Sequence, residues 1–141
     1  MRIVRVLVLA AMLPCATAAG AAALTPSFAC HGVLKRRDIA ELLFGRDIGR
    51  HLGVSETAWR SFVAREITPR FPDGLTVTDA LGQWRDPDSG RIVREPSKRV
   101  EIALPGRADD GARLDAIMSA YKRQFRQRSV GLIVQPACVS F

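Results

Sequence analysis

Two segments with helical periodicity, each lying between strand-like segments, leave few folds open to this chain of 141 residues. In residues 55–67 the apolar side chains recur on one helical face, Ser55 can cap the segment, and Pro69 ends it. A second apolar stripe of the same period covers residues 114–125, and Asp109 or Asp110 before it can cap that helix.

Four strand-like segments surround these two helices. Residues 86–90, with the sequence DPDSG, favour a tight turn and join the middle two strands into a hairpin. Pro96 interrupts the third strand and predicts a bulge or an edge stretch there. Residues 45–54 are expected to form a loop, and residues 24–37 an irregular lead-in. The expected strands cover residues 39–44, 75–84, 92–104 and 130–134.

The order β-α-β-β-α-β predicts an α+β fold, the ferredoxin-like split βαβ sandwich, for a single domain over residues 38–141. Four antiparallel strands would form one sheet with both helices on one face. Right-handed crossovers give the strand order fourth, first, third, second. This order places the start of the first strand beside the end of the fourth strand.

Residues 1–23 have the organisation of a secretory signal peptide. Arg2 and Arg5 precede a short apolar run, which small residues with several A-x-A cleavage sites follow. The run is much shorter than the roughly 20 residues of a membrane-spanning helix, and no later segment is apolar enough to span. We therefore expect export to the periplasm or the medium. Acylation at Cys15 is a less favoured alternative, because Pro14 is a poor residue before a lipid-modified cysteine.

Cleavage of this leader would leave two cysteines, Cys30 and Cys138, near the ends of the remaining chain. In an exported protein an even pair predicts a disulfide, and the expected strand order brings the two residues together. His31 lies beside Cys30 and His51 in another segment, so the paired spacing of a metal site is missing. We expect no metal and no cofactor.

The charge balance favours anionic partners. The chain has 21 Lys and Arg against 14 Asp and Glu, a net charge of +7. Loss of Arg2 and Arg5 with the leader leaves 19 against 14, or +5. We expect no nucleic-acid partner, because the third strand would offer Val93, Glu95 and Ser97 on its open face in place of stacking aromatic residues. The Gly-rich phosphate loops and the G-x-S-x-G motif are absent from the sequence.

Pairing Val77 with Val100 in the hairpin sets the register of the second and third strands. The same register places Asp79 opposite Lys98 and Gln83 opposite Arg94, on the face that the helices cover. Asp79 and Lys98 would then form a partly buried ion pair. We interpret this pair as one that fixes the register, with a functional role as the alternative.

One end of the sandwich is expected to collect guanidinium groups, an amide and an indole. Guanidinium groups near the first residues of a helix suit phosphate or carboxylate, and Trp84 could stack on a planar ligand. The alternative is that the arginines pair with Asp86, Glu95 and Glu56 or remain solvated. The residues predicted to bind a ligand are Arg46, Gln83, Trp84, Arg85, Arg94, Lys98 and Asp79, with Arg126 and Arg128 approaching the same end.

Three classes of function remain open at this point. The favoured one is a binding module for a small anionic ligand or an envelope partner. The second is a small cofactor-free enzyme in which Asp79, Glu95 or His51 carries a proton. The third is a structural homodimer through the open face of the sheet. That face would show Thr76, Thr78, Ala80 and Gly82 beside Glu95, Ser97 and Arg99.

Six motifs are distributed along the chain: ELLFGR (41–46), VSE (54–56), TPRFPDGLTV (68–77), GQWRD (82–86), IVREPSK (92–98) and PAC (136–138). Together they resemble the domain-of-unknown-function family 3574, a group of small exported bacterial proteins. The resemblance covers residues 30–141. It implies a single exported domain, and it brings no catalytic assignment because the family has no established activity.

Overall fold

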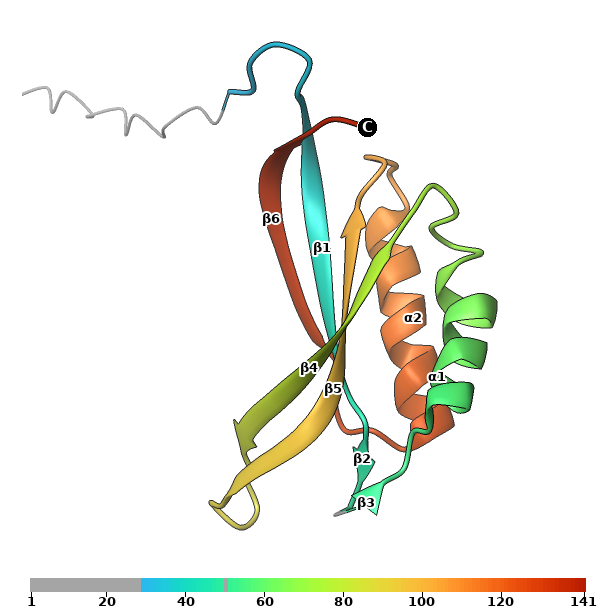
Figure 1. Cartoon of the computed structure of the whole chain (residues 1–141), viewed down its shortest axis with the longest axis vertical. Helices are drawn as coiled ribbons and strands as arrows, with labels where there is room; N and C mark the ends of the chain where they lie inside the picture. Colours follow the sequence, from blue (N-terminus) through green and yellow to red (C-terminus); the bar gives the residue numbers. More distant parts are fainter. Residues whose placement is uncertain (1–28, 50) are drawn as a thin grey trace, which may run out of the picture.

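One antiparallel sheet carries both helices on the same face (Figure 1). The computed structural model describes residues 29–49 and 51–141; the expected signal peptide and Cys15 lie outside these residues. Along the sheet the strands follow the order β4-β5-β1-β6, which confirms the predicted ferredoxin-like α+β fold and strand order. The strands are β1 (Lys35–Gly45), β4 (Thr76–Arg85), β5 (Ile92–Ala103) and β6 (Gly131–Val139). The helices are α1 (Glu56–Phe62), its continuation η1 (Val63–Ile67) and α2 (Asp110–Phe125).

The interior strand β1 and the edge strand β6 are both longer than the sequence pattern predicts. β1 begins at Lys35 rather than at residue 39, so residues 35–37 belong to the sheet and not to an irregular lead-in. β6 continues through Pro136 to Val139. The two extensions pair with each other, Lys35 opposite Val139 and Asp38 opposite Pro136. Hydrogen bonding to a partner strand therefore extends both strands beyond their apolar segments.

The segment expected as a loop contains a small hairpin of β2 (Asp47–Ile48) and β3 (His51–Leu52), so that expectation was wrong. Pro96 makes no bulge, because it pairs one to one with Leu81 inside a continuous β5. It lies just beyond the last pair of the β1–β5 ladder, Gly45 with Ser97, which agrees with the alternative of an edge stretch. Its missing N–H therefore costs the sheet no ladder hydrogen bond.

The helix α1 begins as predicted and ends in a wider turn. The Ser55 hydroxyl accepts a hydrogen bond from the Ala58 amide at 3.2 Å, which confirms the N-cap. The last turn, η1, is π-helical, since the Thr68 amide donates to the Val63 carbonyl at 2.9 Å.

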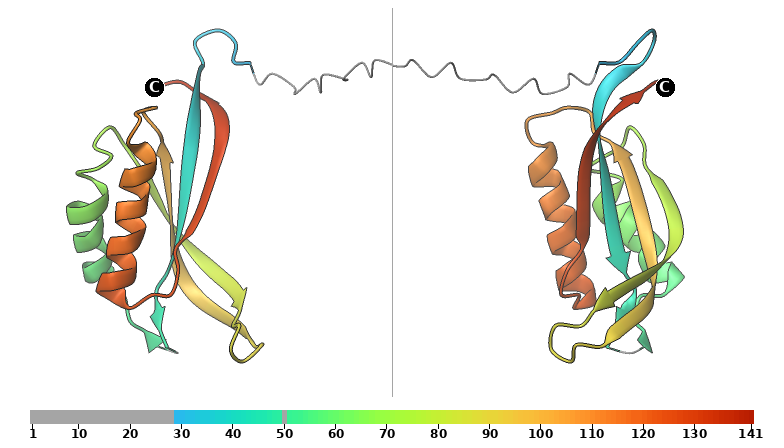
Figure 2. Two further views of the ribbon diagram at one scale, coloured as in Figure 1. Left: turned by 180° about the vertical axis from the view of Figure 1, so that it is seen from behind. Right: turned by 90° about the vertical axis from the view of Figure 1, so that its left-hand side faces the viewer.

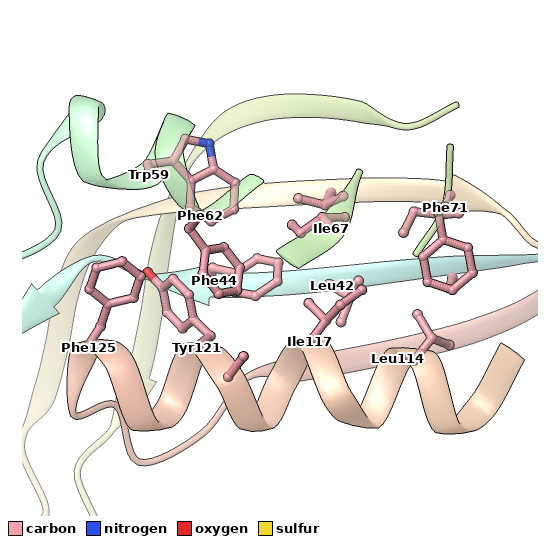
Figure 3. Packing of buried hydrophobic residues seen from close by; sticks show 14 of the residues in the cluster. Leu42, Phe44, Trp59, Phe62, Ile67, Phe71, Leu114, Ile117, Tyr121 and Phe125 are labelled. Atoms are coloured by element: carbon pink, nitrogen blue, oxygen red, sulfur yellow. The ribbon is translucent and has the colours of Figure 1, made fainter. Parts of the chain in front are cut away.

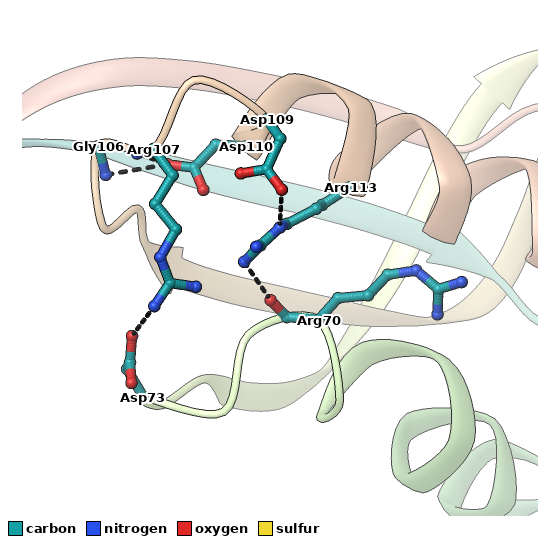
Figure 4. Close-up of polar contacts among 7 residues, drawn as sticks. All are labelled: Arg70, Asp73, Gly106, Arg107, Asp109, Asp110 and Arg113. Atoms are coloured by element: carbon teal, nitrogen blue, oxygen red, sulfur yellow. Dashed lines mark hydrogen bonds and ion pairs between the residues drawn. The ribbon is translucent and has the colours of Figure 1, made fainter.

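The start of α2 differs from the predicted cap (Figure 4). The Asp109 carboxylate accepts from Arg113 Nε at 2.8 Å, and its side chain caps no helix amide. The buried Asp110 carboxylate instead accepts from the amides of Gly106 and Arg107, at 2.9 and 2.8 Å. Arg113 also donates to the Arg70 carbonyl at 3.1 Å, so these bonds tie the two crossover loops together.

An aromatic cluster fills the space between the helices and the sheet (Figure 3). The Tyr121 ring lies 4.7 Å from that of Phe44 and 4.8 Å from that of Phe125, as measured between centroids. Trp59 and Phe62 of α1 complete the cluster. The Tyr121 hydroxyl donates to the Gly45 carbonyl at 2.8 Å, so a buried side chain fixes the end of β1.

A disulfide joins Cys30 to Cys138, as the sequence predicts. Their Cα atoms are 5.6 Å apart and the two residues are separated by 108 positions. Within residues 29–49 and 51–141, no helix is long and apolar enough to cross a membrane.

Candidate functional site

The β4–β5 hairpin has the predicted register. Val77 pairs with Val100, Asp79 with Lys98 and Gln83 with Arg94. Gln83 and Arg94 were expected beside Asp79 and Lys98 on the helix-covered face, but they line a groove together with Trp84 and Glu95. Alternation alone does not produce this separation; the hairpin bends away from the helices and twists strongly (Figure 2). The predicted site residues therefore fall into two groups.

The first group is an ion-pair cluster on the helix-covered face, formed by Lys98, Asp79, Glu56 and Arg46. Lys98 is buried, and its Nζ lies 2.6 Å from Asp79 Oδ1 and 2.9 Å from Glu56 Oε2. Arg46 Nη1 lies 3.4 Å from the same Glu56 oxygen, and Arg46 Nε donates to the Val54 carbonyl at 2.9 Å. The predicted ion pair is therefore present, and two cations compensate two anions.

The pKa values in this cluster favour its charged state. Burial alone lowers the pKa of the Lys98 ammonium, but the hydrogen bonds and charges of Asp79 and Glu56 outweigh burial and raise it. The hydrogen bond and the charge of Lys98 hold the pKa of Asp79 below its usual value. A cavity of about 380 Å³ lies beside the cluster, between α1 and β4, and Lys98, Glu56 and Arg60 lie on its lining. Its lysine and glutamate are already paired, so this side offers little unsatisfied charge to a ligand.

The second group lines a groove of about 1120 Å³ on the opposite, helix-free face of the sheet, here called the open-face groove. In Figure 2 the β4–β5 hairpin bends away from the helices, and its tip passes below the ends of β1 and β6. Arg128 Nη1, in the loop before β6, holds the tip through Asp88 Oδ2 at 2.6 Å. The groove is the space that the curled hairpin encloses against the sheet.

Glu95 lies at the centre of the open-face groove and fixes its aromatic wall. Its Oε1 accepts a hydrogen bond from Trp84 Nε1 at 3.0 Å, and its Oε2 accepts from the Asp47 amide at 3.1 Å. The indole of Trp84 is thereby held in one orientation although the residue is 39% exposed. A rigid, accessible indole is a suitable surface for stacking.

Glycines make room for the side chains that line the groove. A Cβ atom on Gly45 would lie 2.7 Å from both carboxylate oxygens of Glu95, and one on Gly82 would lie 2.6 Å from Ser97 Oγ. At Gly131 on β6 the Leu43 side chain lies over the position that a Cβ atom would take. The sequence analysis did not use these glycines. A glycine inside a strand often marks close approach of another group, and that signal was available.

Three arginines, Arg91, Arg94 and Arg126, also line the groove. Across residues 29–49 and 51–141, none of their side chains takes part in an ion pair or a hydrogen bond. Asp86 lies on the same lining, but its carboxylate accepts from the amides of Asp88 and Ser89. These bonds hold the pKa of Asp86 below its usual value.

The predicted ligand residues are thus only partly brought together. Gln83, Trp84 and Arg94 line the open-face groove, whereas Arg85 lines neither cavity. The cluster residues Arg46, Asp79 and Lys98 lie on the other face. In the described part of the chain, no three His, Cys, Asp or Glu side chains are grouped so that they could hold a metal ion.

Several solved structures superpose with this chain over most of its length. A phage SAM lyase in complex with S-methyl-5'-thioadenosine superposes with a TM-score of 0.60 at 17% identity, over 83% of this chain and 97% of that chain. Its apo structure gives 0.55 at 17% identity, over 82% and 98% of the two chains. CutA from Synechococcus elongatus gives 0.46 at 15% identity, over 72% and 79%. At these identities the similarity establishes the fold alone.

No curated protein matches the chain. The model of one protein family, described as "Protein of unknown function (DUF3574)", matches residues 39–141. This match covers most of the chain and confirms the resemblance seen in its sequence motifs. The chain is therefore a member of the DUF3574 family.

Proposed function

We propose that this chain is an exported binding protein that holds a small anionic ligand with a planar group in the open-face groove. The observation that carries the proposal is the fixed indole of Trp84 beside three arginines that lack ion pairs within residues 29–49 and 51–141. The groove, at about 1120 Å³, is large enough for a ligand of nucleotide size.

Each part of the groove has a distinct role in this proposal. The Trp84 indole stacks on the planar group, and the Glu95 carboxylate keeps the ring in place. Arg94 and Arg91 provide planar, permanently charged donors for a phosphate or carboxylate.

Export is part of the proposal and is supported by two features of the chain. The leader-like residues 1–23 have the organisation of a signal peptide. The disulfide between Cys30 and Cys138 is typical of proteins in oxidising compartments. The ligand would accordingly be a solute of the periplasm or of the medium.

Binding is tested by thermal shift with four probes: inorganic phosphate, citrate, adenosine monophosphate and S-methyl-5'-thioadenosine. S-methyl-5'-thioadenosine is included as a probe because the structure of a phage protein with the same fold contains it. We expect adenosine monophosphate, which combines a ring with a phosphate, to raise the midpoint most. Bound ligand at 100 times its Kd stabilises by about 2.7 kcal/mol.

The variant Arg94→Ala should lose this shift, whereas the control Arg123→Ala should keep it. Arg123 is exposed on α2 and does not line the groove, and its replacement by alanine removes the same charge as Arg94→Ala. Equal shifts in both variants would contradict the proposed site, and so would the absence of a shift with all four probes.

A second function, a small enzyme with Glu95 as general base, is favoured by one observation. The Glu95 carboxylate is placed in the groove itself, where it would reach a bound substrate, whereas Asp79 is committed to Lys98. Conversion of a bound probe that Glu95→Gln abolishes, with binding retained, would establish the enzyme. A wild-type protein that binds a probe without converting it would support the binding function and contradict the enzyme.

A further inference from the structure

The outer edge of β6 is an uncharged, apolar strip on a basic protein. β6 ends the sheet and pairs only with β1 among the described strands (Figure 1). Leu132, Ile133 and Val134 follow one another there and are 38%, 46% and 49% exposed. Residues 131–141 contain no charged side chain, although 25% of the whole chain is charged. An exposed apolar edge strand of this kind is a template for pairing with another strand.

The hydrogen bonds of β1 show which main-chain groups of β6 face outward. The Leu104 amide donates to the Asp38 carbonyl at 2.8 Å, so the main chain of Asp38 faces β5. Asp38 is also the partner of Pro136, which therefore directs its own main chain away from β1. Because this direction alternates along a strand, the N–H and C=O groups of Leu132 and Val134 also face outward. Pro136, which has no N–H, interrupts the row of outward donors between Val134 and Cys138.

We propose that β6 pairs antiparallel with β6 of a second copy of this chain, around a two-fold axis at Ile133. Leu132 then lies opposite Val134 of the second copy, and each pair exchanges both of its main-chain hydrogen bonds. An axis at Gln135 would set Val134 against Pro136, which has no N–H. An axis at Gly131 would set Val134 against Arg128, whose side chain is paired with Asp88.

The side chains at this edge suit a second copy better than a charged partner. Leu132 and Val134 pair with the buried Leu42 and Ala40 of β1, so they lie on the helix side and would meet each other across the axis. Ile133 pairs with Glu41 and lies on the open face, where it would meet its own copy. The uncharged strip also lets two basic chains, each of net charge +5 without the leader, approach without like charges facing each other at the contact.

The area of contact predicts a reversible dimer. With the axis at Ile133, residues 131–135 of the two β6 strands lie opposite each other over about 17 Å, and a sheet edge about 10 Å thick then buries roughly 170 Å² per copy. Stable interfaces bury about 800 Å² per partner. The dimer should therefore form in a concentration-dependent way. This inference is independent of the ligand proposed for the groove.

A cysteine crosslink tests both the partner and the register. In Ile133→Cys the two new cysteines would face each other in a non-hydrogen-bonded pair, with Cα atoms about 4.5 Å apart, within disulfide range. Mild oxidation should give a covalent dimer. The control Gln135→Cys lies opposite Gly131 of the second copy, about 13 Å from its own copy, and should give several-fold less. Equal crosslinking in both variants, or none in Ile133→Cys, would overturn the register.

Sedimentation velocity over a concentration series tests association without a new thiol. The wild-type protein should shift from monomer to dimer as its concentration rises. Val134→Lys, at a half-exposed position, should keep its thermal midpoint and weaken association by at least tenfold, because two ammonium groups would be brought together. A wild type that stays monomeric at several hundred micromolar, or a variant that associates as well as the wild type, would refute the proposal.

Discussion

Removing the Cys30–Cys138 disulfide should cause a large loss of stability. The bond closes a loop of 108 residues, and in the chain-entropy treatment a loop of this length contributes about 5 kcal/mol at 25 °C. The stabilisation arises from the unfolded chain, which the crosslink confines. Both cysteines are only half-buried in the folded protein, so serine replaces them without adding a buried polar group.

The double variant Cys30→Ser/Cys138→Ser avoids a free thiol and should lose 3–5 kcal/mol. For a domain of about 110 residues this corresponds to a fall in the thermal midpoint of roughly 12–20 °C. Urea denaturation and calorimetry measure the loss, and the urea dependence should become steeper because the released unfolded chain exposes more surface. The reduced wild type serves as the matched control and should behave like the variant. A variant that unfolds within 1 kcal/mol of the oxidised wild type would refute this reasoning.

Two further predictions concern the core and the groove. Tyr121 is the only tyrosine of the chain, and its burial, together with the nearby Glu95 charge, raises the pKa of its phenol. The pKa of this phenol is higher in the folded than in the unfolded protein, so its contribution to stability is complete below pH 10 and is lost as the pH rises further. The absorbance of tyrosinate at 295 nm should therefore appear only as the protein unfolds. A tyrosine that titrates near pH 10 in the folded protein would contradict this prediction. Gly45→Ala should displace the Glu95 carboxylate, break its two hydrogen bonds and cost about 1–2 kcal/mol. The control Gly111→Ala has open space in α2 and should stabilise by about 0.5–1 kcal/mol; equal effects of the two alanines would show that Glu95 does not hold the groove.

The strand order and the hairpin register could be predicted because both depend on local patterns. The alternation around Val77 and Val100, with the turn at residues 86–90, admits one register that buries the apolar side chains. The disulfide was predicted separately, from an even pair of cysteines in a chain expected to be exported, and the same topology brings the two residues together. Strand ends could not be predicted in this way, because Lys35 and Val139 are in the sheet only through pairing with each other.

The site was harder to predict than the fold because it depends on curvature. The alternation places Lys98 and Glu95 on opposite faces, but the sequence analysis grouped Gln83, Trp84 and Arg94 with Asp79 and Lys98 in one site, and the structure separates them. The sequence did not predict how strongly the β4–β5 hairpin bends, and this bend brings Asp88 against Arg128. Twist accumulates from many small rotations along both strands, and local residue patterns do not fix its sum. Arg91 was missed for this reason.

The most direct test of the ligand site is an NMR titration of the oxidised, ¹⁵N-labelled protein with adenosine monophosphate. The indole N–H of Trp84 is bonded to Glu95 and reports on the groove, while the indole of Trp59, 2% exposed, reports on the core. We predict that the Trp84 indole and the amides of Gly45 and Gly82 shift with one common Kd while the Trp59 indole stays unchanged. Unchanged groove resonances, or shifts confined to the surroundings of Lys98 beneath α1, would contradict the proposed site.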